Sequence, residues 1–126
     1  MIRRTVLAAL ALAGLTFAAL PAQAADYPSR TITMIVPYPA GGPTDQTARQ
    51  IAQSMSQTLK QTVIVENVSG GGTIIATNKV AKSAPDGYTL LLHNLQISAN
   101  VTLYKNLPFN TEKDLTPIIF VNSNPP

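Results

Sequence analysis

The sequence predicts an α/β fold, built as an open parallel sheet with helices on both faces. Two observations carry this prediction. Apolar runs rich in β-branched residues recur at 31–36 (TITMIV), 62–66 (TVIVE) and 88–93 (YTLLLH), as expected for buried strands. Segments with helical spacing separate these runs and the connections are short. An alternation of strands and helices with short links implies parallel strands joined by right-handed crossovers.

Two helices are expected between the three strands. The first follows a Pro- and Gly-rich loop at 37–43, and Thr44 or Asp45 suits its N-cap. Its apolar positions recur at helical spacing and are Ala48, Ile51, Ala52, Met55 and Leu59. The second helix is expected over residues 73–83, after the Gly-rich loop 67–72. The turn residues at 85–87 (PDG) end it.

Beyond the third strand the pattern is less regular. A polar loop is expected around 94–100, and an irregular stretch over 101–115 with a turn at 106–110. Residues 117–121 (PIIFV) are strand-like, and the sequence then stops at Pro125-Pro126. Because nothing follows for this strand to pack against, we expect the chain to be truncated here.

The N-terminus predicts a cleaved signal peptide over residues 1–24. Arg3 and Arg4 precede an apolar run, and alanines at 22 and 24 form a cleavage pattern. The chain has 9 Lys and Arg against 6 Asp and Glu; without Arg3 and Arg4 the balance is seven to six, about +1. No basic stripe remains to indicate nucleic acid. The chain contains no cysteine, which excludes disulfides, thiol catalysis and a lipid-anchored cysteine. A periplasmic protein is expected.

Candidate ligand-binding groups lie where the strands end. In an open parallel sheet, ligands bind beyond the carboxyl ends of the strands, here at loops 39–44, 69–73 and 93–99. Two of these loops carry adjacent glycines and lead into helices, whose first N–H groups attract anions. Tight-turn geometry explains the same glycines equally well. No phosphate-binding glycine motif is present.

The residues give little indication of catalysis. His93 is the single histidine, and a serine triad would have to bring it to Ser69 or Ser98 and a carboxylate. A histidine hydrogen-bonded at a strand end is the favoured interpretation. Asp45 is favoured as a helix cap over a direct ligand contact. Scattered carboxylates and one histidine predict no metal site.

Four motifs in order resemble one family. The chain is similar to the substrate-binding proteins of tripartite tricarboxylate transporters, the Bug family. The motifs that carry the resemblance are 27–37 (YPSRTITMIVP) with 40–45 (AGGPTD), 65–67 (VEN), 84–91 (APDGYTLL), and 103–109 (LYKNLPF) before 114–118 (DLTPI). The resemblance covers residues 26–122.

The resemblance implies a two-lobed type II periplasmic binding-protein fold, with residues 25–116 in lobe 1, residues 117–126 starting the crossover, and the second lobe absent. It implies capture of a small organic acid (a di- or tricarboxylate, an acidic amino acid or an aromatic acid) for membrane permease subunits, with no reaction, cofactor or metal. The implied ligand-binding residues are Ala40, Gly41, Gly42, Thr44, Asp45, Ser69, Gly72, Thr73, His93 and Asn94.

Three alternatives stay open. The chain could be such a carrier, an incomplete product without independent activity, or a small exported α/β hydrolase that uses His93. If the second lobe is absent, we expect weak ligand binding at best, because one open lobe leaves the ligand hydrated.

Overall fold

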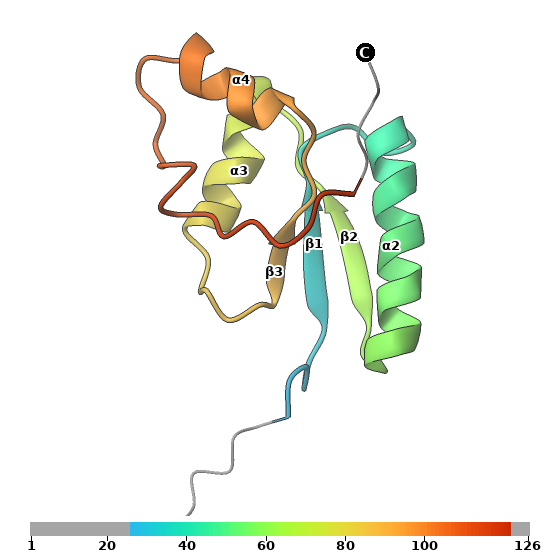
Figure 1. The fold of residues 1–126 in the computed structure, drawn as a ribbon. Helices are drawn as coiled ribbons and strands as arrows, with labels where there is room; N and C mark the ends of the chain where they lie inside the picture. Colours follow the sequence, from blue (N-terminus) through green and yellow to red (C-terminus); the bar gives the residue numbers. More distant parts are fainter. Residues whose placement is uncertain (1–25, 122–126) are drawn as a thin grey trace, which may run out of the picture.

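A computed structural model describes residues 26–121 as a three-stranded parallel sheet with helices packed on it (Figure 1). The predicted signal peptide lies outside the described residues. The strands are β1 (Ile32–Val36), β2 (Val63–Asn67) and β3 (Thr89–Leu91). Their order is β2-β1-β3, with β1 in the centre. The three predicted strands are therefore confirmed, each within a few residues of its predicted bounds.

The parallel register places the carboxyl ends of all three strands at one edge of the sheet. Ile32 is opposite Val63 and Val36 opposite Asn67, while Thr33 is opposite Thr89 on the other side of β1. Helix α2 (Pro43–Leu59) connects β1 to β2, and α3 (Ile74–Ala81) connects β2 to β3. Every loop that leaves a strand for a helix consequently starts from the same edge.

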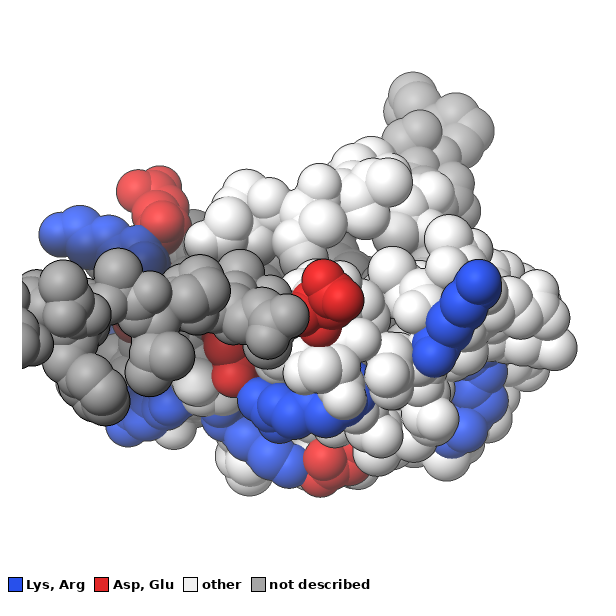
Figure 2. All heavy atoms as spheres, turned by 90° about the horizontal axis from the view of Figure 1, so that it is seen from below, with Lys and Arg blue, Asp and Glu red and all other residues white. Residues whose placement is uncertain are grey.

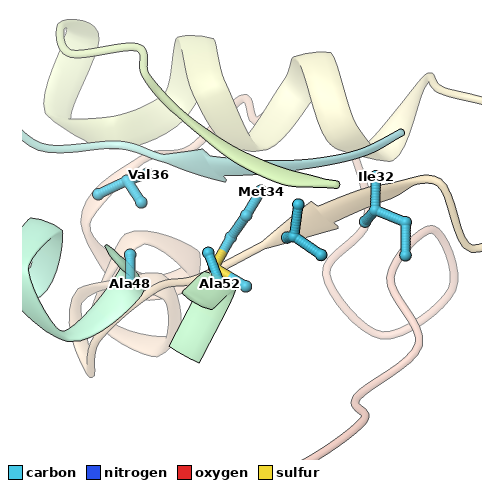
Figure 3. Close-up of a cluster of buried hydrophobic side chains, with 6 residues drawn as sticks. Ile32, Met34, Val36, Ala48 and Ala52 are labelled. Carbon is cyan, nitrogen blue, oxygen red and sulfur yellow. The ribbon is translucent and has the colours of Figure 1, made fainter. Parts of the chain in front are cut away.

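The two faces of the sheet carry separate apolar clusters because successive side chains of β1 point to opposite sides. One cluster faces α2 (Figure 3) and consists of Ile32, Met34, Val36, Ala48, Ala52 and Val63. The other consists of Ile35, Ala76 and Val80, with α3 supplying the last two. Small side chains at Ala48 and Ala52 let α2 lie close to β1. Helices on both faces, as predicted, follow from this alternation.

The start of α2 differs from the prediction. The helix begins at Pro43, with Gly42 as its N-cap, so neither Thr44 nor Asp45 occupies the cap position. Proline suits the first helical position because its fixed φ matches the helix and the missing N–H would be unpaired there. Asp45 instead lies within the first turn and reaches back to the loop.

A further helix, α4 (Gln96–Leu103), occupies the segment predicted as a polar loop and an irregular stretch. Its sequence (QISANVTL) has weak helix propensity and no clear amphipathic pattern. Tertiary contacts decide its conformation, since Asn100 is 1% exposed and anchors the helix to the loop before α3. The loop prediction for 96–103 is therefore wrong.

Residues 117–121 form no strand in the part of the chain that the structure describes. Their apolar side chains are exposed, with Ile118, Ile119 and Phe120 at 77%, 80% and 72%. A strand is defined by its ladder of hydrogen bonds, and within residues 26–121 no other segment pairs with this one. The predicted fourth strand is thus corrected to an extended segment.

An aromatic cluster lies at the opposite edge of the sheet, where β1 and β3 begin. Tyr27 and Tyr88 meet edge to face, and Tyr27 donates a hydrogen bond to the carbonyl of Gly87 at 2.7 Å. Arg30 lies 3.9 Å from the Tyr88 ring centre and pairs with Asp86 at 2.8 Å.

On the face seen in Figure 2, basic and acidic side chains are interspersed. Among the described residues, no helix has the length and apolar character needed to cross a bilayer.

Candidate ligand-binding site

Three loops meet at the carboxyl edge of the sheet, as the sequence predicts. They are residues 37–42 after β1, residues 68–73 after β2 and residues 92–95 after β3. All ten predicted site residues lie on these loops or in the first turn of α2. Half of the side chains that join the loops to one another come from other positions.

The first connection is a polar cluster around Asp45, whose side chain is nearly fully buried. Its Oδ2 accepts hydrogen bonds from the N–H of Gly41 at 2.8 Å and from Nε of Arg49 at 2.9 Å. Its Oδ1 accepts from Nδ2 of Asn67 at 2.9 Å. Asn67 also donates to the carbonyl of Tyr38 at 3.0 Å and accepts from Nη2 of Arg49 at 3.1 Å. The cluster therefore ties the loop after β1 to the end of β2.

The charge of Asp45 is compensated inside this cluster. Its hydrogen bond to Arg49, followed by those from Gly41 and Asn67, lowers the pKa of the Asp45 carboxyl to about 2. The carboxylate is therefore ionised at neutral pH, and both of its oxygens are occupied. Because Arg49 balances its charge, Asp45 can stand beside an anion without a net repulsive charge from this pair.

The second connection runs from Tyr38 to the loop after β3. The Tyr38 hydroxyl donates to Oδ1 of Asn94 at 2.5 Å and lies 3.3 Å from Nδ1 of His93. The Tyr38 and His93 rings meet edge to face. Oδ1 of Asn94 also accepts from the N–H of Gln96 at 2.9 Å, at the start of α4. Burial raises the pKa of the Tyr38 phenol, which keeps it protonated as a donor.

The third connection joins His93 to the loop after β2. Nδ1 of His93 lies 2.9 Å from the carbonyl of Asn94, which can only accept, so we assign the proton to Nδ1. Nε2 then accepts from the Thr73 hydroxyl at 3.0 Å. Burial lowers the pKa of His93, partly opposed by the Asn94 carbonyl, which favours this neutral form. Thr73 Oγ1 in turn accepts from Nδ2 of Asn100 at 2.9 Å.

Two glycines show why this residue type is needed here. Gly41 has φ +85° with open space where a side chain would start. Gly72 has φ +61°, and a Cβ built on it would collide with the Tyr104 hydroxyl. Backbone conformation and close approach thus account for both positions without a ligand. The glycines alone therefore do not identify a binding site.

The unused backbone donors are more informative. No acceptor within residues 26–121 pairs with the N–H groups of Thr44, Gly71 or Gly72. Gly71 is exposed, and Thr44 and Gly72 are half-buried. Thr44 lies in the first turn of the 17-residue helix α2, where the helix dipole favours negative charge. These N–H groups come from the first turn of α2 and from the loop after β2, which the side-chain network holds at the same edge.

The arrangement does not favour the hydrolase alternative. His93 makes no hydrogen bond to Ser69 or Ser98 among the described residues. Its hydroxyl partner, Thr73, is 4% exposed and is also held by Asn100, so a substrate could not reach it. Within residues 26–121, no group of three or more His, Asp or Glu side chains could hold a metal ion.

A hollow on the described surface lies elsewhere, between α2 and the outer edge of β2. It is open and shallow and is lined by Arg49, Ala52, Gln53, Val63, Ile64 and Val65. Most of these side chains belong to the middle of their elements, away from the loop rim. We do not connect this hollow with ligand binding, because it is open to solvent and lies away from the loops, with Arg49 and Gln53 as its polar side chains.

Four residues of the network were missed from the sequence: Tyr38, Arg49, Asn67 and Asn100. The Asp45–Arg49 pair carried a usable signal, since the two are four positions apart on a predicted helix. Asn67, directly after a predicted strand, offered a weaker one. In these contacts Tyr38 and Asn100 pair with residues 27 to 56 positions away, which no local pattern reveals.

The fold, with its loops gathered at the carboxyl edge of a parallel sheet, matches part of solved periplasmic binding proteins and is a lobe of that class. Residues 47–126 match the family described as "Tripartite tricarboxylate transporter family receptor", and the chain belongs to this family. It is a family of solute-binding receptors and not an enzyme class, and its members are periplasmic receptors. The predicted family membership is thereby confirmed.

Individual relatives agree with this assignment. Protein BugT of Bordetella pertussis is 42% identical over 109 residues, which are 85% of this chain and 33% of BugT. The structure of MatC from Rhodopseudomonas palustris with bound malate is 42% identical, covering 72% of this chain and 31% of MatC, with a TM-score of 0.64. A second R. palustris protein, solved with adipate, is 42% identical over 52% of this chain and 22% of its own, with a TM-score of 0.51.

The chain spans about a third of the length of the curated relatives it matches, 33–38% for the first four.

Proposed function

We propose that this chain forms part of the first lobe of a periplasmic receptor that captures a small organic dicarboxylate and delivers it to the membrane permease of a tripartite tricarboxylate-type transporter. In this proposal residues 1–24 are a cleaved signal peptide and residues 25–116 belong to lobe 1. The observation that carries it is the set of N–H groups at Thr44, Gly71 and Gly72 that no acceptor in the described part of the chain occupies, held at one edge of the sheet by a continuous side-chain network.

The chemistry of these donors suits a carboxylate. A carboxylate accepts up to about four hydrogen bonds, and backbone N–H groups at helix starts are ready-made anion donors. The network offers no fixed positive charge that would select phosphate, since Arg49 is already paired with Asp45. The structures with malate and with adipate indicate that relatives of this chain bind dicarboxylates.

We assign roles to the ten predicted site residues accordingly. Thr44, Gly72 and the neighbouring Gly71 supply donors, Ala40, Gly42 and Ser69 line the same loops, and Asn94 stands on the rim. Asp45, His93, Thr73 and Gly41 act mainly by fixing the loops, because their polar groups are already engaged.

A titration of the ¹⁵N-labelled full chain with malate and with adipate tests the proposal. We expect amide shifts concentrated at residues 40–45, 69–73 and 93–96, with a dissociation constant in the millimolar range or weaker. Affinity should be low because the described residues leave this edge open to water. The uncharged diamide of malate is the control and should cause no such shifts.

Three kinds of result would count against the proposal. Shifts scattered over the surface, or equal shifts with the diamide, would remove the assignment of the carboxylate site to these loops. Micromolar or tighter binding by this chain would show that the argument from an open lobe is wrong. Hydrolysis of esters that is lost in His93→Ala would favour the enzyme alternative.

A further inference from the structure

Thr73 has an unusual backbone conformation. Its φ is +74° and its ψ is −4°, in the left-handed region. It follows Gly71 and Gly72, whose φ values are +56° and +61°, so three successive residues are left-handed. Glycine adopts this conformation freely, whereas for a β-branched residue it is a genuine outlier. Surrounding contacts must therefore hold Thr73 in place.

Asn100 of α4 supplies the main contacts. Its Nδ2 donates to the carbonyl of Gly72 at 2.9 Å and to Oγ1 of Thr73 at 2.9 Å. The Thr73 carbonyl accepts from the Thr77 hydroxyl at 2.9 Å, and the Thr73 hydroxyl also meets His93. The carbonyl before Thr73, its side chain and its own carbonyl are thus all bound.

Asn100 carries an unfavourable feature of its own. Its side chain is 1% exposed, and its Oδ1 has no hydrogen-bond partner among the described residues. The amide orientation is fixed because both acceptors face Nδ2. A buried unpaired acceptor is costly, and an apolar side chain would avoid that cost. Backbone strain and an unpaired polar atom therefore occur side by side, a combination that points to function.

We propose that Asn100 is a positioning residue that holds Thr73 in the left-handed conformation and thereby fixes the directions of the Gly71 and Gly72 N–H groups. The support that Asn100 gives to Thr73 does not depend on the proposed function, while its importance for ligand binding rests on it. Helix α4 accordingly belongs to the binding rim, although it contributes no residue to the predicted site.

NMR and urea unfolding of the full chain test this proposal with Asn100→Ala in two backgrounds. A left-handed residue gives a strong intraresidue NOE between its N–H and Hα. We expect this NOE at Thr73 in the wild type and its loss in Asn100→Ala. The variant should lower the folding equilibrium constant about 30-fold, as two lost hydrogen bonds imply.

In the Thr73→Gly background the same Asn100→Ala change should lower the folding constant only about fivefold, because glycine needs no support in this conformation and only the hydrogen bond to the Gly72 carbonyl remains to be lost. Asn106→Ala, an exposed amide with no hydrogen bond among the described residues, is the matched control and should leave the Thr73 NOE unchanged. Equal losses in both backgrounds, or a Thr73 NOE that persists in Asn100→Ala, would overturn the proposal.

If Asn100→Ala is unfolded, the double variant Thr73→Gly/Asn100→Ala decides the question. The proposal requires it to regain a folded spectrum, and failure to do so contradicts it. A malate titration separates this result from the proposed function. If malate causes no amide shifts in the wild-type chain, ligand binding at these loops is contradicted. The Thr73 NOE and the comparison of the two backgrounds would still test the role of Asn100.

Discussion

Asn67 offers a quantitative test of the network that joins the loops. Its side chain makes three hydrogen bonds, to Asp45, to the carbonyl of Tyr38 and from Arg49. At about 1 kcal/mol each, Asn67→Ala should lower the free energy of unfolding by about 3 kcal/mol. Truncation also leaves two acceptors at this edge without a donor, so we expect no smaller effect.

The pKa of Asp45 provides a second measurement on the same variant. Asn67 is one of the groups that lower this pKa to about 2, after Arg49 and Gly41, so removing it should raise the pKa toward 3.8. Asp45 then contributes stability that is present above about pH 3.8 and is lost as the pH falls through the folded-state pKa. Acid unfolding of Asn67→Ala should therefore begin at higher pH than that of the wild type.

Urea unfolding followed by circular dichroism gives the stability, and NMR titration of the carboxyl carbon gives the pKa. Asn106→Ala makes the same chemical change at an exposed position and should alter the free energy of unfolding by less than about 0.5 kcal/mol. If Asn67→Ala costs less than about 1 kcal/mol and leaves the Asp45 pKa unchanged, the cluster does not hold the loop.

Three further predictions follow from burial, backbone conformation and packing. Burial lowers the pKa of His93 below its usual 6.5. Its contribution to stability should therefore be complete above about pH 6.5 and lost as the pH falls through the lowered folded-state pKa. In urea unfolding from pH 8 to 4.5, the free energy of unfolding should depend more steeply on pH in the wild type than in His93→Gln. Gly41→Ala should cost about 1 kcal/mol because φ is +85°, whereas Gly42→Ala, with φ −74°, should be nearly neutral; equal effects in thermal unfolding would contradict the strain argument. Ile35→Ala, at a fully buried position, should lower the free energy of unfolding in urea by about 3–4 kcal/mol. Ile64→Ala, at 47% exposure on the edge strand, should lower it by about 1 kcal/mol or less. Similar losses in the two variants would mean that α3 is not packed on this face as described.

The sequence alone determined the class of fold and the placement of the loops. Hydrophobic period is a local property, so 31–36 and the spacing of Ala48, Ala52 and Met55 were enough to separate strand from helix. Short links between such segments leave a parallel sheet as the available arrangement. The loops after all three strands were therefore expected at one edge, and the register confirms it. Linear motifs identified the family by the same kind of local evidence.

Tertiary structure alone decided which side chains hold those loops. Asn100 folds α4 from a weakly helical sequence by reaching a carbonyl 28 residues earlier, and Tyr38 bridges to Asn94, 56 residues later. Residues 117–121 show the converse, because a strand-like sequence remains unpaired where the described chain offers no ladder. Propensity and period are read along the chain, whereas hydrogen-bond partners are set by proximity in space. That is why the position of the loops could be predicted from the sequence, and the side-chain network that joins them could not.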